Sequence, residues 1–339
     1  MTSSVFIFAA VFGLSYIGVS LVRQLSIDRN LLSIPNERSS HTVPMPHGAG
    51  IVIAVIALAA YAAVSLSFAG TVSWGYLSGA ALVSLVSLID DIKPIRFTWR
   101  LLAHSAAAVL LMADVDTWHG ITMLGNLQFG VWGYVITFLW IVWMVNCYNF
   151  MDGIDGLAGL QAVLTGVAWA LLSYILDMPV ILVFSGIIAF SSLGFLVHNW
   201  NPARIFMGDV GATFLGFTFA ALPLLARTSA SKSPDLLPFA AVLFLWLFIF
   251  DAIMTILRRA LKGERIWTPH REHLFQRLVS SGLSHRWVTI IYGILASILI
   301  VSVLVSVAFR EDIGLAMLPV VGVLTAALLA ICLKRGVLN

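Results

Sequence analysis

Long apolar runs alternate with short polar connections along nearly the whole sequence. Eleven such runs lie at about 4–23, 48–69, 72–89, 101–113, 131–147, 157–176, 179–198, 211–227, 236–257, 287–309 and 313–333. A helix of about 20 apolar residues crosses the hydrocarbon core of a bilayer, and the fourth run is short for this task. The runs lack the alternating polar and apolar positions of barrel strands. The pattern therefore predicts an all-α, polytopic integral membrane protein with about 11 transmembrane helices.

The composition agrees with this fold class. Of the 339 residues, 60% are hydrophobic and 10% are charged, whereas soluble domains carry about a quarter charged residues. We find no soluble domain, internal repeat or low-complexity tract. Residues 1–339 are therefore predicted to form a single transmembrane domain whose partner is the lipid bilayer, with no nucleic acid. Cys147 and Cys332 lie in apolar runs and are too few for a disulfide framework or a cysteine metal site.

The distribution of positive charge predicts the orientation. Of the 19 Lys and Arg residues, only Arg227, Lys232 and Arg310 lie after even-numbered runs; the others lie after odd-numbered runs or at the C-terminus. Because cytoplasmic connections carry the excess of Lys and Arg, the N-terminus is predicted to be periplasmic and the C-terminus cytoplasmic.

Four polar clusters follow runs 3, 5, 7 and 9, which places all of them at the cytoplasmic face. They read "LIDDIKPIRFTWR", "NCYNFMDGIDG", "HNWNPARIFMGDVG" and "TPHREHLFQRL", the last within a cytoplasmic loop at 258–286. Carboxylates near a membrane are costly and usually functional. The clusters bring Asp90, Asp91, Asp152, Asp155 and Asp209 to one side. This pattern is typical of a site for an anionic ligand held through a divalent metal.

The first cluster contains two adjacent carboxylates. Asp90 and Asp91 could simply cap a helix where water begins. However, adjacent carboxylates raise one another's pKa unless a cation offsets them, and Lys93 lies two residues further on. A metal or phosphate site is therefore the better interpretation.

The second cluster carries polar residues at every third position. Asn146, Asn149, Asp152 and Asp155 would lie on neighbouring positions of one helix face. A helix-terminating turn is the alternative, but such a turn needs one Asp-Gly pair rather than two pairs with two asparagines. We therefore interpret this stretch as part of a working site.

The remaining polar residues each leave two interpretations open. Asp209 is either a helix N-cap or a magnesium ligand, since Mg²⁺ binds one or two carboxylates plus substrate phosphates. His270 and His273 could ligate zinc, but no third ligand of the usual kind stands beside them, so they are better explained as donors to a diphosphate. Asp251, inside run 9, either faces the cavity or pairs with a neighbouring helix.

Two loops complete the pattern. The first cytoplasmic loop, "PNERSSHTVPMPHGAG" at 35–50, supplies Arg38, His41 and His47, which are either substrate contacts or the charges of a solvated connector. The extracytoplasmic stretch "DVDTWHGITMLGNLQFG" shows some alternation, which indicates a hairpin.

With these motifs in this order, the sequence resembles the polyprenyl-phosphate N-acetylhexosamine-1-phosphate transferases of glycosyltransferase family 4. The motifs that carry the resemblance are "DDIK" at 90–93, "NFMDGIDGLAG" at 149–159, "FMGDVG" at 206–211 and "HREHLFQRL" at 270–278. The loop at 35–50 resembles that of the O-antigen-initiating branch. Eleven spans with the N-terminus outside are similar to the family's non-peptidoglycan members.

The resemblance implies a reaction and its participants. An N-acetylhexosamine 1-phosphate of GlcNAc, QuiNAc or FucNAc type would pass from a UDP-sugar to undecaprenyl phosphate, giving undecaprenyl-diphosphate-sugar and UMP. The product would initiate O-antigen or related cell-envelope glycan synthesis at the bacterial inner membrane. Mg²⁺ is the implied cofactor, with Mn²⁺ as a substitute, and a homodimer is left open.

The resemblance also implies residue roles. Asp90 would act as a base toward the lipid phosphate, Asp91 would organise that phosphate, and Asp209, with Asp152 and Asp155, would hold the metal. The implied substrate-binding residues are Arg38, His41, Lys93, Asn146, Asn149, Asp152, Asp155, His270, Arg271 and His273. Direct attack by the lipid phosphate is favoured over a covalent intermediate on Asp209 or Asp90.

Two other classes of protein are less consistent with the sequence. A transporter of an anionic or nucleotide-linked substrate usually carries its coupling residues near the bilayer midplane, on interrupted helices in repeated halves. Here the polar residues lie at the ends of runs, and we find no repeat. An intramembrane aspartyl protease is disfavoured because Phe206 stands where Gly-x-Gly-Asp would begin.

Overall fold

The computed structural model describes residues 2–35, 43–118, 120–121, 127–228, 236–264, 271–309 and 313–338. All eleven predicted spans are helical. The helices are α1 (Thr2–Asp28), α2 (Gly50–Ala69), α3 (Trp74–Ile92), α4 (Phe97–Asp114), α5 (Trp132–Met151), α6 (Leu157–Ile175), α7 (Pro179–Asn199), α8 (Asp209–Arg227), α9 (Leu236–Phe244), α10 (Trp246–Leu261), α11 (Leu274–Ser280), α12 (His285–Ala308) and α13 (Ile313–Lys334).

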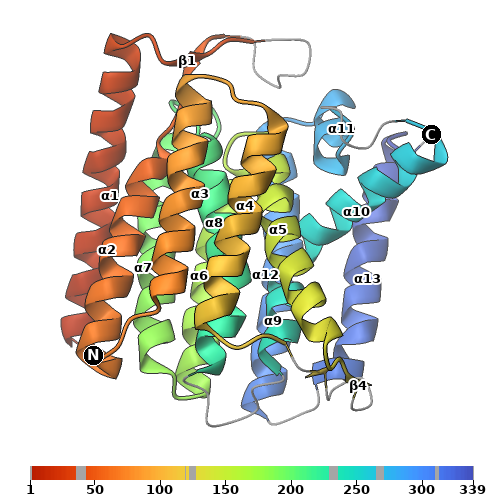
Figure 1. Cartoon of the computed structure of the whole chain (residues 1–339). Helices are drawn as coiled ribbons and strands as arrows, with labels where there is room; N and C mark the ends of the chain where they lie inside the picture. The colour runs from red at the N-terminus through yellow and green to blue at the C-terminus, as the bar shows by residue number, and fades with distance from the viewer. Residues whose placement is uncertain are drawn as a thin grey trace.

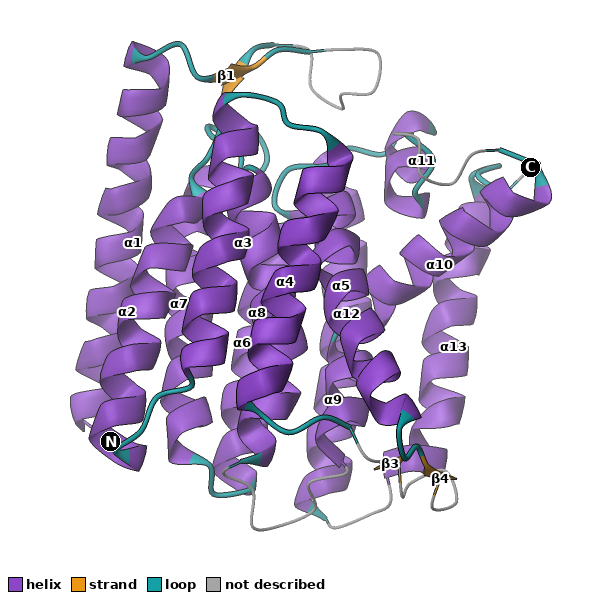
Figure 2. Ribbon diagram, viewed as in Figure 1, coloured by secondary structure: helices purple, strands orange, loops and turns teal. Residues whose placement is uncertain are grey.

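Most of these helices run side by side in one bundle (Figures 1 and 2). In the described part of the chain, nine helices are long and apolar enough to cross a membrane, or ten if α9 and α10 form one span. Helix α4 is not among them, yet it packs between α3 and α5 along the bundle. The all-α, polytopic fold predicted from the sequence is confirmed.

Exposed aromatic side chains mark both ends of the bundle. Trp74 and Trp132 begin α3 and α5, and Tyr174 lies at the end of α6; Trp99 and Trp287 lie in the first turns of α4 and α12, at the opposite end. All five are exposed. Trp and Tyr favour the two interfaces between bilayer and water. Exposed Trp and Tyr side chains at both ends of the bundle are thus typical of a membrane protein.

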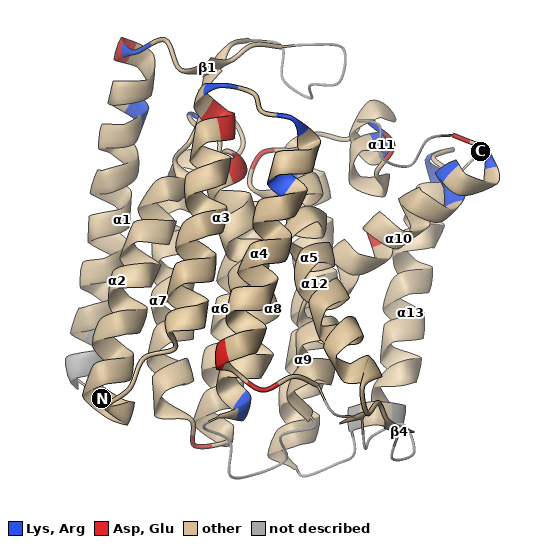
Figure 3. Cartoon of the chain, in the orientation of Figure 1, with Lys and Arg blue, Asp and Glu red and all other residues tan. Residues whose placement is uncertain are grey.

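Two short strand pairs lie at opposite ends of the bundle. Strand β1 (Leu32–Ser33) pairs with β2 (Met45–Pro46) in the first loop. Strand β3 (Gly120–Ile121) pairs with β4 (Leu127–Gln128), which confirms the predicted hairpin. Figure 3 shows that the Lys and Arg residues gather at the end with β1, α10 and α11. The four polar clusters predicted to be cytoplasmic emerge at that same end.

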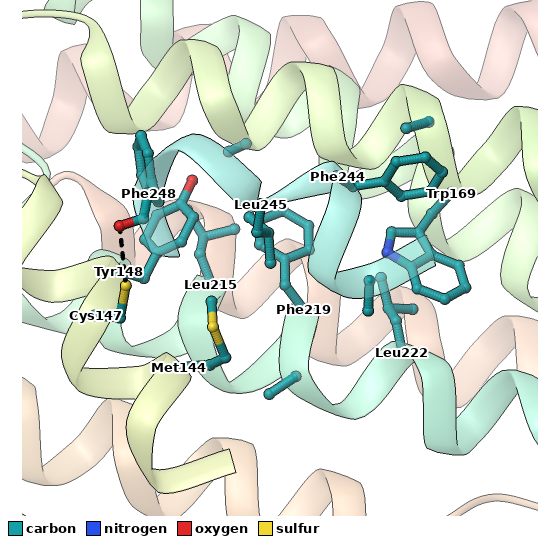
Figure 4. Packing of buried hydrophobic residues seen from close by; sticks show 14 of the residues in the cluster. Met144, Cys147, Tyr148, Trp169, Leu215, Phe219, Leu222, Phe244, Leu245 and Phe248 are labelled. Atoms are coloured by element: carbon teal, nitrogen blue, oxygen red, sulfur yellow. Dashed lines mark hydrogen bonds between the residues drawn. The ribbon is translucent and has the colours of Figure 1, made fainter. Parts of the chain in front are cut away.

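Helix α8 forms the centre of the bundle. Nearly all of its span (94%) is buried, against α2, α3, α5 and α9. A helix surrounded on all sides must be apolar on all faces, and its sequence, "DVGATFLGFTFAALPLLAR", meets this requirement. Figure 4 shows part of this core, where the ring of Tyr148 lies 5.7 Å from that of Phe219 and 5.3 Å from that of Phe248.

A bend of 71° separates α9 from α10, where the sequence predicted one continuous run over 236–257. The prediction of one continuous helix was wrong. The break falls at Leu245, and no proline or glycine at that point marks it in the sequence. A broken helix in a membrane needs other partners for its freed backbone carbonyls. Gln161 supplies one, because its Nε2 donates to the carbonyl of Phe244 at 2.8 Å. The bend directs α10 away from the bundle axis (Figure 1).

The Gln161 bond predicts a stability effect. Gln161→Met should leave the Phe244 carbonyl unsatisfied and cost about 1–3 kcal/mol, which a fall in the Tm of the purified protein in detergent would detect. Gln24→Met, the same change on the exposed face of α1, serves as the control and should leave the Tm nearly unchanged. Equal Tm values for the two variants would contradict this account of the bend.

Candidate active site

A cavity of about 540 Å³ opens at the end of the bundle that carries β1 and α11. Its walls come from the ends of α3 and α5, the start of α8, the first loop, and residues of α11 and α12. A cavity of this size is typical of sites for ligands as large as a nucleotide. All five predicted carboxylates line it, namely Asp90, Asp91, Asp152, Asp155 and Asp209.

Asp91 connects the end of α3 to the start of α8. Its carboxylate accepts hydrogen bonds from the backbone N–H groups of Asp209, at 2.9 Å, and Val210, at 3.1 Å. A helix N-terminus has unpaired N–H groups and favours negative charge. Asp91 therefore caps α8 from another helix. Asp209 is not the N-cap considered above, because Gly208 occupies that position, with φ of +78°, and the Asp209 side chain is left for other contacts.

The first loop is joined to the same place by backbone hydrogen bonds. Phe206 donates to the carbonyl of Pro46 at 2.9 Å, and Gly50 donates to that of Met207 at 2.8 Å. Helices α2 and α8 touch at Gly50 and Gly211, where a Cβ on Gly50 would lie 2.2 Å from the Cα of Gly211. The loop therefore places His47 at the cavity wall.

His47 contacts Asp91 without forming an ion pair at neutral pH. Its Nδ1 lies 3.8 Å from Oδ1 of Asp91. Burial lowers the pKa of His47, and the negative charge of Asp209 only partly opposes this effect. An imidazole whose pKa lies below its ordinary value of about 6.5 is neutral at pH 7.

Arg100 bridges two carboxylates of the cavity. Its Nη1 lies 2.7 Å from Oδ2 of Asp90 and 3.1 Å from Oδ2 of Asp209. The other oxygen of Asp90 accepts the N–H of Ile95 at 2.7 Å. Arg100 thus supplies the positive charge that lets aspartates from α3 and α8 lie close together.

Asp155 is fully engaged by the protein. Its Oδ2 accepts hydrogen bonds from Nδ2 of Asn201, at 2.7 Å, and from the N–H of Ala203, at 3.1 Å. Its Oδ1 lies 3.2 Å from Nδ1 of His285. Burial by itself would raise the pKa of Asp155, but the bonds from His285, Asn201 and Ala203 outweigh it and hold the pKa below its ordinary value. Asp155 therefore holds the loop after α7 and the start of α12 in place.

Asp152 has the opposite environment. No residue in the described part of the chain donates a hydrogen bond to its carboxylate, which lines the cavity. Burial, together with the negative charges of Asp209, Asp91 and Asp155, raises its pKa to about 7. A buried carboxylate without a partner is costly. Asp152 is thus the group in the cavity that most requires a cation from a ligand.

The arrangement fits a magnesium ion that is held jointly with a substrate. Among the described residues, no three His, Cys, Asp or Glu side chains converge as a preformed metal site. Mg²⁺, however, usually takes one or two carboxylates plus phosphate and water oxygens. Asp152 and Asp209 offer carboxylate oxygens to the cavity, whereas both oxygens of Asp155 and of Asp91 are in contact with nitrogen atoms of the protein.

The structure does not bring every predicted substrate-binding residue to the cavity. Asn149 lines it, but Asn146 bonds to the carbonyl of Val142. Lys93 caps the end of α3 and is exposed. Arg271 is half-buried away from the lining, and His273 is buried against Asp251 at 3.1 Å. Arg38, His41 and His270 lie outside the described residues.

Sequence reasoning missed several residues that line the cavity, among them Arg100, Gln276 and His285. Arg100 was counted only as an orientation charge, although it lies in the same polar cluster as Asp90 and Asp91, directly before the apolar run 101–113. Gln276 lies in a motif from which only the His and Arg residues were considered. His285 lies 130 residues from its partner Asp155, and no local pattern connects the two.

The contrast between Asp152 and Asp155 predicts opposite stability effects. The raised pKa of Asp152 means that its ionisation opposes folding, by an amount that grows as the pH rises from about 4 to about 7. Asp152→Asn should therefore raise the free energy of unfolding in EDTA by at most about 4 kcal/mol, at about 1.4 kcal/mol per pKa unit. The Tm should rise with it, more at pH 8 than at pH 5. Asp155→Asn should lower the Tm at both pH values, because the lowered pKa stabilises the fold above about pH 4. Shifts of the same sign in both variants would refute this assignment.

Comparisons with known proteins agree with the geometry. Residues 73–227 match the model of glycosyl transferase family 4. A probable undecaprenyl-phosphate N-acetylglucosaminyl 1-phosphate transferase of Bacillus subtilis is 29% identical over 84% of this chain and 80% of its own length. An undecaprenyl-phosphate alpha-N-acetylglucosaminyl 1-phosphate transferase of Salmonella typhi is 27% identical over 98% and 90%. A decaprenyl-phosphate N-acetylglucosaminephosphotransferase of Mycobacterium tuberculosis is 32% identical over 45% and 41%.

Proposed function

Because this chain belongs to glycosyl transferase family 4, among the polyprenyl-phosphate N-acetylhexosamine-1-phosphate transferases, we propose that it transfers an N-acetylhexosamine 1-phosphate from a UDP-sugar to undecaprenyl phosphate. The names of the relatives favour GlcNAc as the sugar; QuiNAc and FucNAc are the alternatives. The product starts an O-antigen or related cell-envelope glycan at the bacterial inner membrane. The observation that carries the proposal is the unpartnered carboxylate of Asp152 beside Asp209 in a cavity at the end of a membrane bundle.

The proposed reaction is a single phosphoryl transfer. An oxygen of undecaprenyl phosphate attacks the sugar-linked phosphorus of the UDP-sugar. The bond between that phosphorus and the bridging oxygen breaks, and UMP leaves with the bond electrons. Reactions of this kind depend on positioning and charge neutralisation more than on covalent chemistry. The lipid phosphate reaches the cavity from the bilayer and the nucleotide from water.

Asp152 and Asp209 are the proposed ligands of Mg²⁺, with Mn²⁺ as a substitute. The ion, when bound, neutralises the diphosphate and stabilises the departing UMP. Asp155 is left out of this set because nitrogen atoms of the protein contact both of its oxygens. It supports the metal site by holding the loop after α7.

Arg100 and Asp90 are proposed to receive the lipid phosphate. The guanidinium of Arg100 has five N–H donors in a planar fork that suits phosphate, and it is already oriented by Asp90 at 2.7 Å. A strong base is not needed, since a phosphate monoester with a second pKa of about 6 is mostly dianionic at pH 7. Direct attack therefore requires no covalent intermediate on Asp90 or Asp209.

The decisive test is UMP release by the purified protein in detergent. We expect release from UDP-GlcNAc that requires both undecaprenyl phosphate and Mg²⁺. Asp209→Asn should lower kcat by at least about 10²-fold, because it weakens charge stabilisation at the reacting phosphates. UDP-QuiNAc and UDP-FucNAc, assayed in parallel, identify the preferred sugar. Failure of a folded wild-type protein to release UMP from all three donors would overturn the proposal.

Arg100 gives a second test with a matched control. Arg100→Met should raise the KM for undecaprenyl phosphate and lower kcat, together by at least about tenfold in kcat/KM, since a charge-assisted bond to phosphate is worth about 1.5–3 kcal/mol. Arg96→Met removes a cation one helical turn away that is exposed and does not line the cavity, so its kcat/KM should remain close to that of the wild type. A similar loss in both variants would mean that general positive charge, rather than Arg100, matters.

A further inference from the structure

Helix α11 is attached to the bundle through one buried carboxylate. Asp251, on α10, is fully buried. It accepts the N–H groups of Leu274 and Phe275, at 2.8 and 3.1 Å, and Nδ1 of His273 lies 3.1 Å from it. The hydroxyl of Tyr292, on α12, donates to it at 2.6 Å. A buried carboxylate must be satisfied in this way to be tolerated, so α10, α11 and α12 meet in a fixed geometry.

In this position α11 packs against the loop that carries Asp152. A Cβ at position 153 would lie 2.8 Å from the ring of Phe275 and 3.2 Å from Nε2 of Gln276. Gly153 is therefore the residue that lets α11 approach. The approach places Gln276 in the cavity wall, whereas His273 is turned away toward Asp251.

Gln276 keeps one end of its amide for the protein and presents the other to the cavity. Its Oε1 accepts the N–H of His273 at 3.3 Å, one half of a capping box. The residue as a whole is 8% exposed. Among the described residues no hydrogen bond of Nε2 is found, and Gln276 lines the cavity, so its N–H₂ group is left for a ligand. Such a group favours an oxygen of a ligand.

We propose that Gln276 is a substrate-binding residue of this site: its Nε2 donates to an oxygen of the nucleotide sugar, and Asp251 is the positioning residue that holds it there. The inference rests on the function proposed above. The donor nucleotide is assigned to Gln276 because Gly153 and Asp152 lie beside it. Arg100 and Asp90, assigned to the lipid phosphate, belong to α4 and α3, on the other side of α5 (Figure 1).

Two substitutions separate this role from helix capping. Gln276→Glu keeps an oxygen that can accept the N–H of His273, as Glu does in a capping box, but it has no N–H₂ group and adds a charge. Gln276→Met removes the donor without adding charge. Both should raise the KM and the Kd for UDP-GlcNAc by at least about tenfold and leave the KM for undecaprenyl phosphate unchanged. Gln276→Glu should also keep the wild-type Tm. Gln24→Glu, the same change on the exposed face of α1, is the control.

Asp251→Asn tests the positioning role. An amide cannot accept all the bonds that this carboxylate accepts, so the backbone N–H groups of Leu274 and Phe275 should exchange with deuterium faster than in the wild type. The KM for UDP-GlcNAc should rise while the KM for undecaprenyl phosphate stays constant. Unchanged exchange, or an equal rise in both KM values, would overturn the positioning role.

The binding of UDP-GlcNAc, measured by calorimetry without the lipid, tests the role of Gln276 separately from the proposed transfer reaction. If the wild type binds the nucleotide sugar but releases no UMP, the proposed reaction fails, and the Kd values still decide the role of Gln276. If Gln276→Glu and Gln276→Met bind as the wild type does, or if only the charged variant weakens binding, the role of Gln276 is refuted even when turnover is normal. If the wild type neither binds nor turns over a UDP-sugar, both proposals fall.

Discussion

The carboxylate of Asp91 holds together the elements that form the candidate active site. It accepts two N–H groups at the start of α8, the helix around which the bundle packs. A helix N-terminus favours negative charge, so the start of α8 can carry Asp209 close to Asp90. The close contact of Gly50 with Gly211 brings the first loop to the same point. The end of α3, the start of α8 and the first loop therefore meet at the cavity.

Asp155 and Asp251 use the same physical device at two other places. Each is a carboxylate that accepts N–H groups from a segment distant in sequence, one fixing the loop at 201–203 and the other fixing α11. A carboxylate has about four acceptor positions and can satisfy several donors at once. Because these aspartates serve the fold, neither is among the proposed metal ligands, Asp152 and Asp209. Asp152 adds a local cost in stability, as is common where a site must bind a charged ligand.

Much of the fold could be predicted because a bilayer leaves few alternatives. Every spanning segment must satisfy its backbone internally, so apolar runs of sufficient length had to be helices, and all eleven are. The polar clusters at the ends of α3, α5 and α7 had to meet at one end of the bundle. The pairing of β3 with β4 could also be predicted, since the alternation of polar and apolar residues is a local signal.

The sequence by itself determined the fold class, the helices and the set of carboxylates at one face, because these depend on hydrophobic length and on the alternation of sides. Only the tertiary structure decided what each carboxylate does. The bond of Gln161 to Phe244 that accommodates the bend, the contact of His285 with Asp155, and the bridge of Arg100 between Asp90 and Asp209 all join residues that are distant in the chain. Such contacts are set by helix packing, in which a side chain finds its partner only after the helices have met.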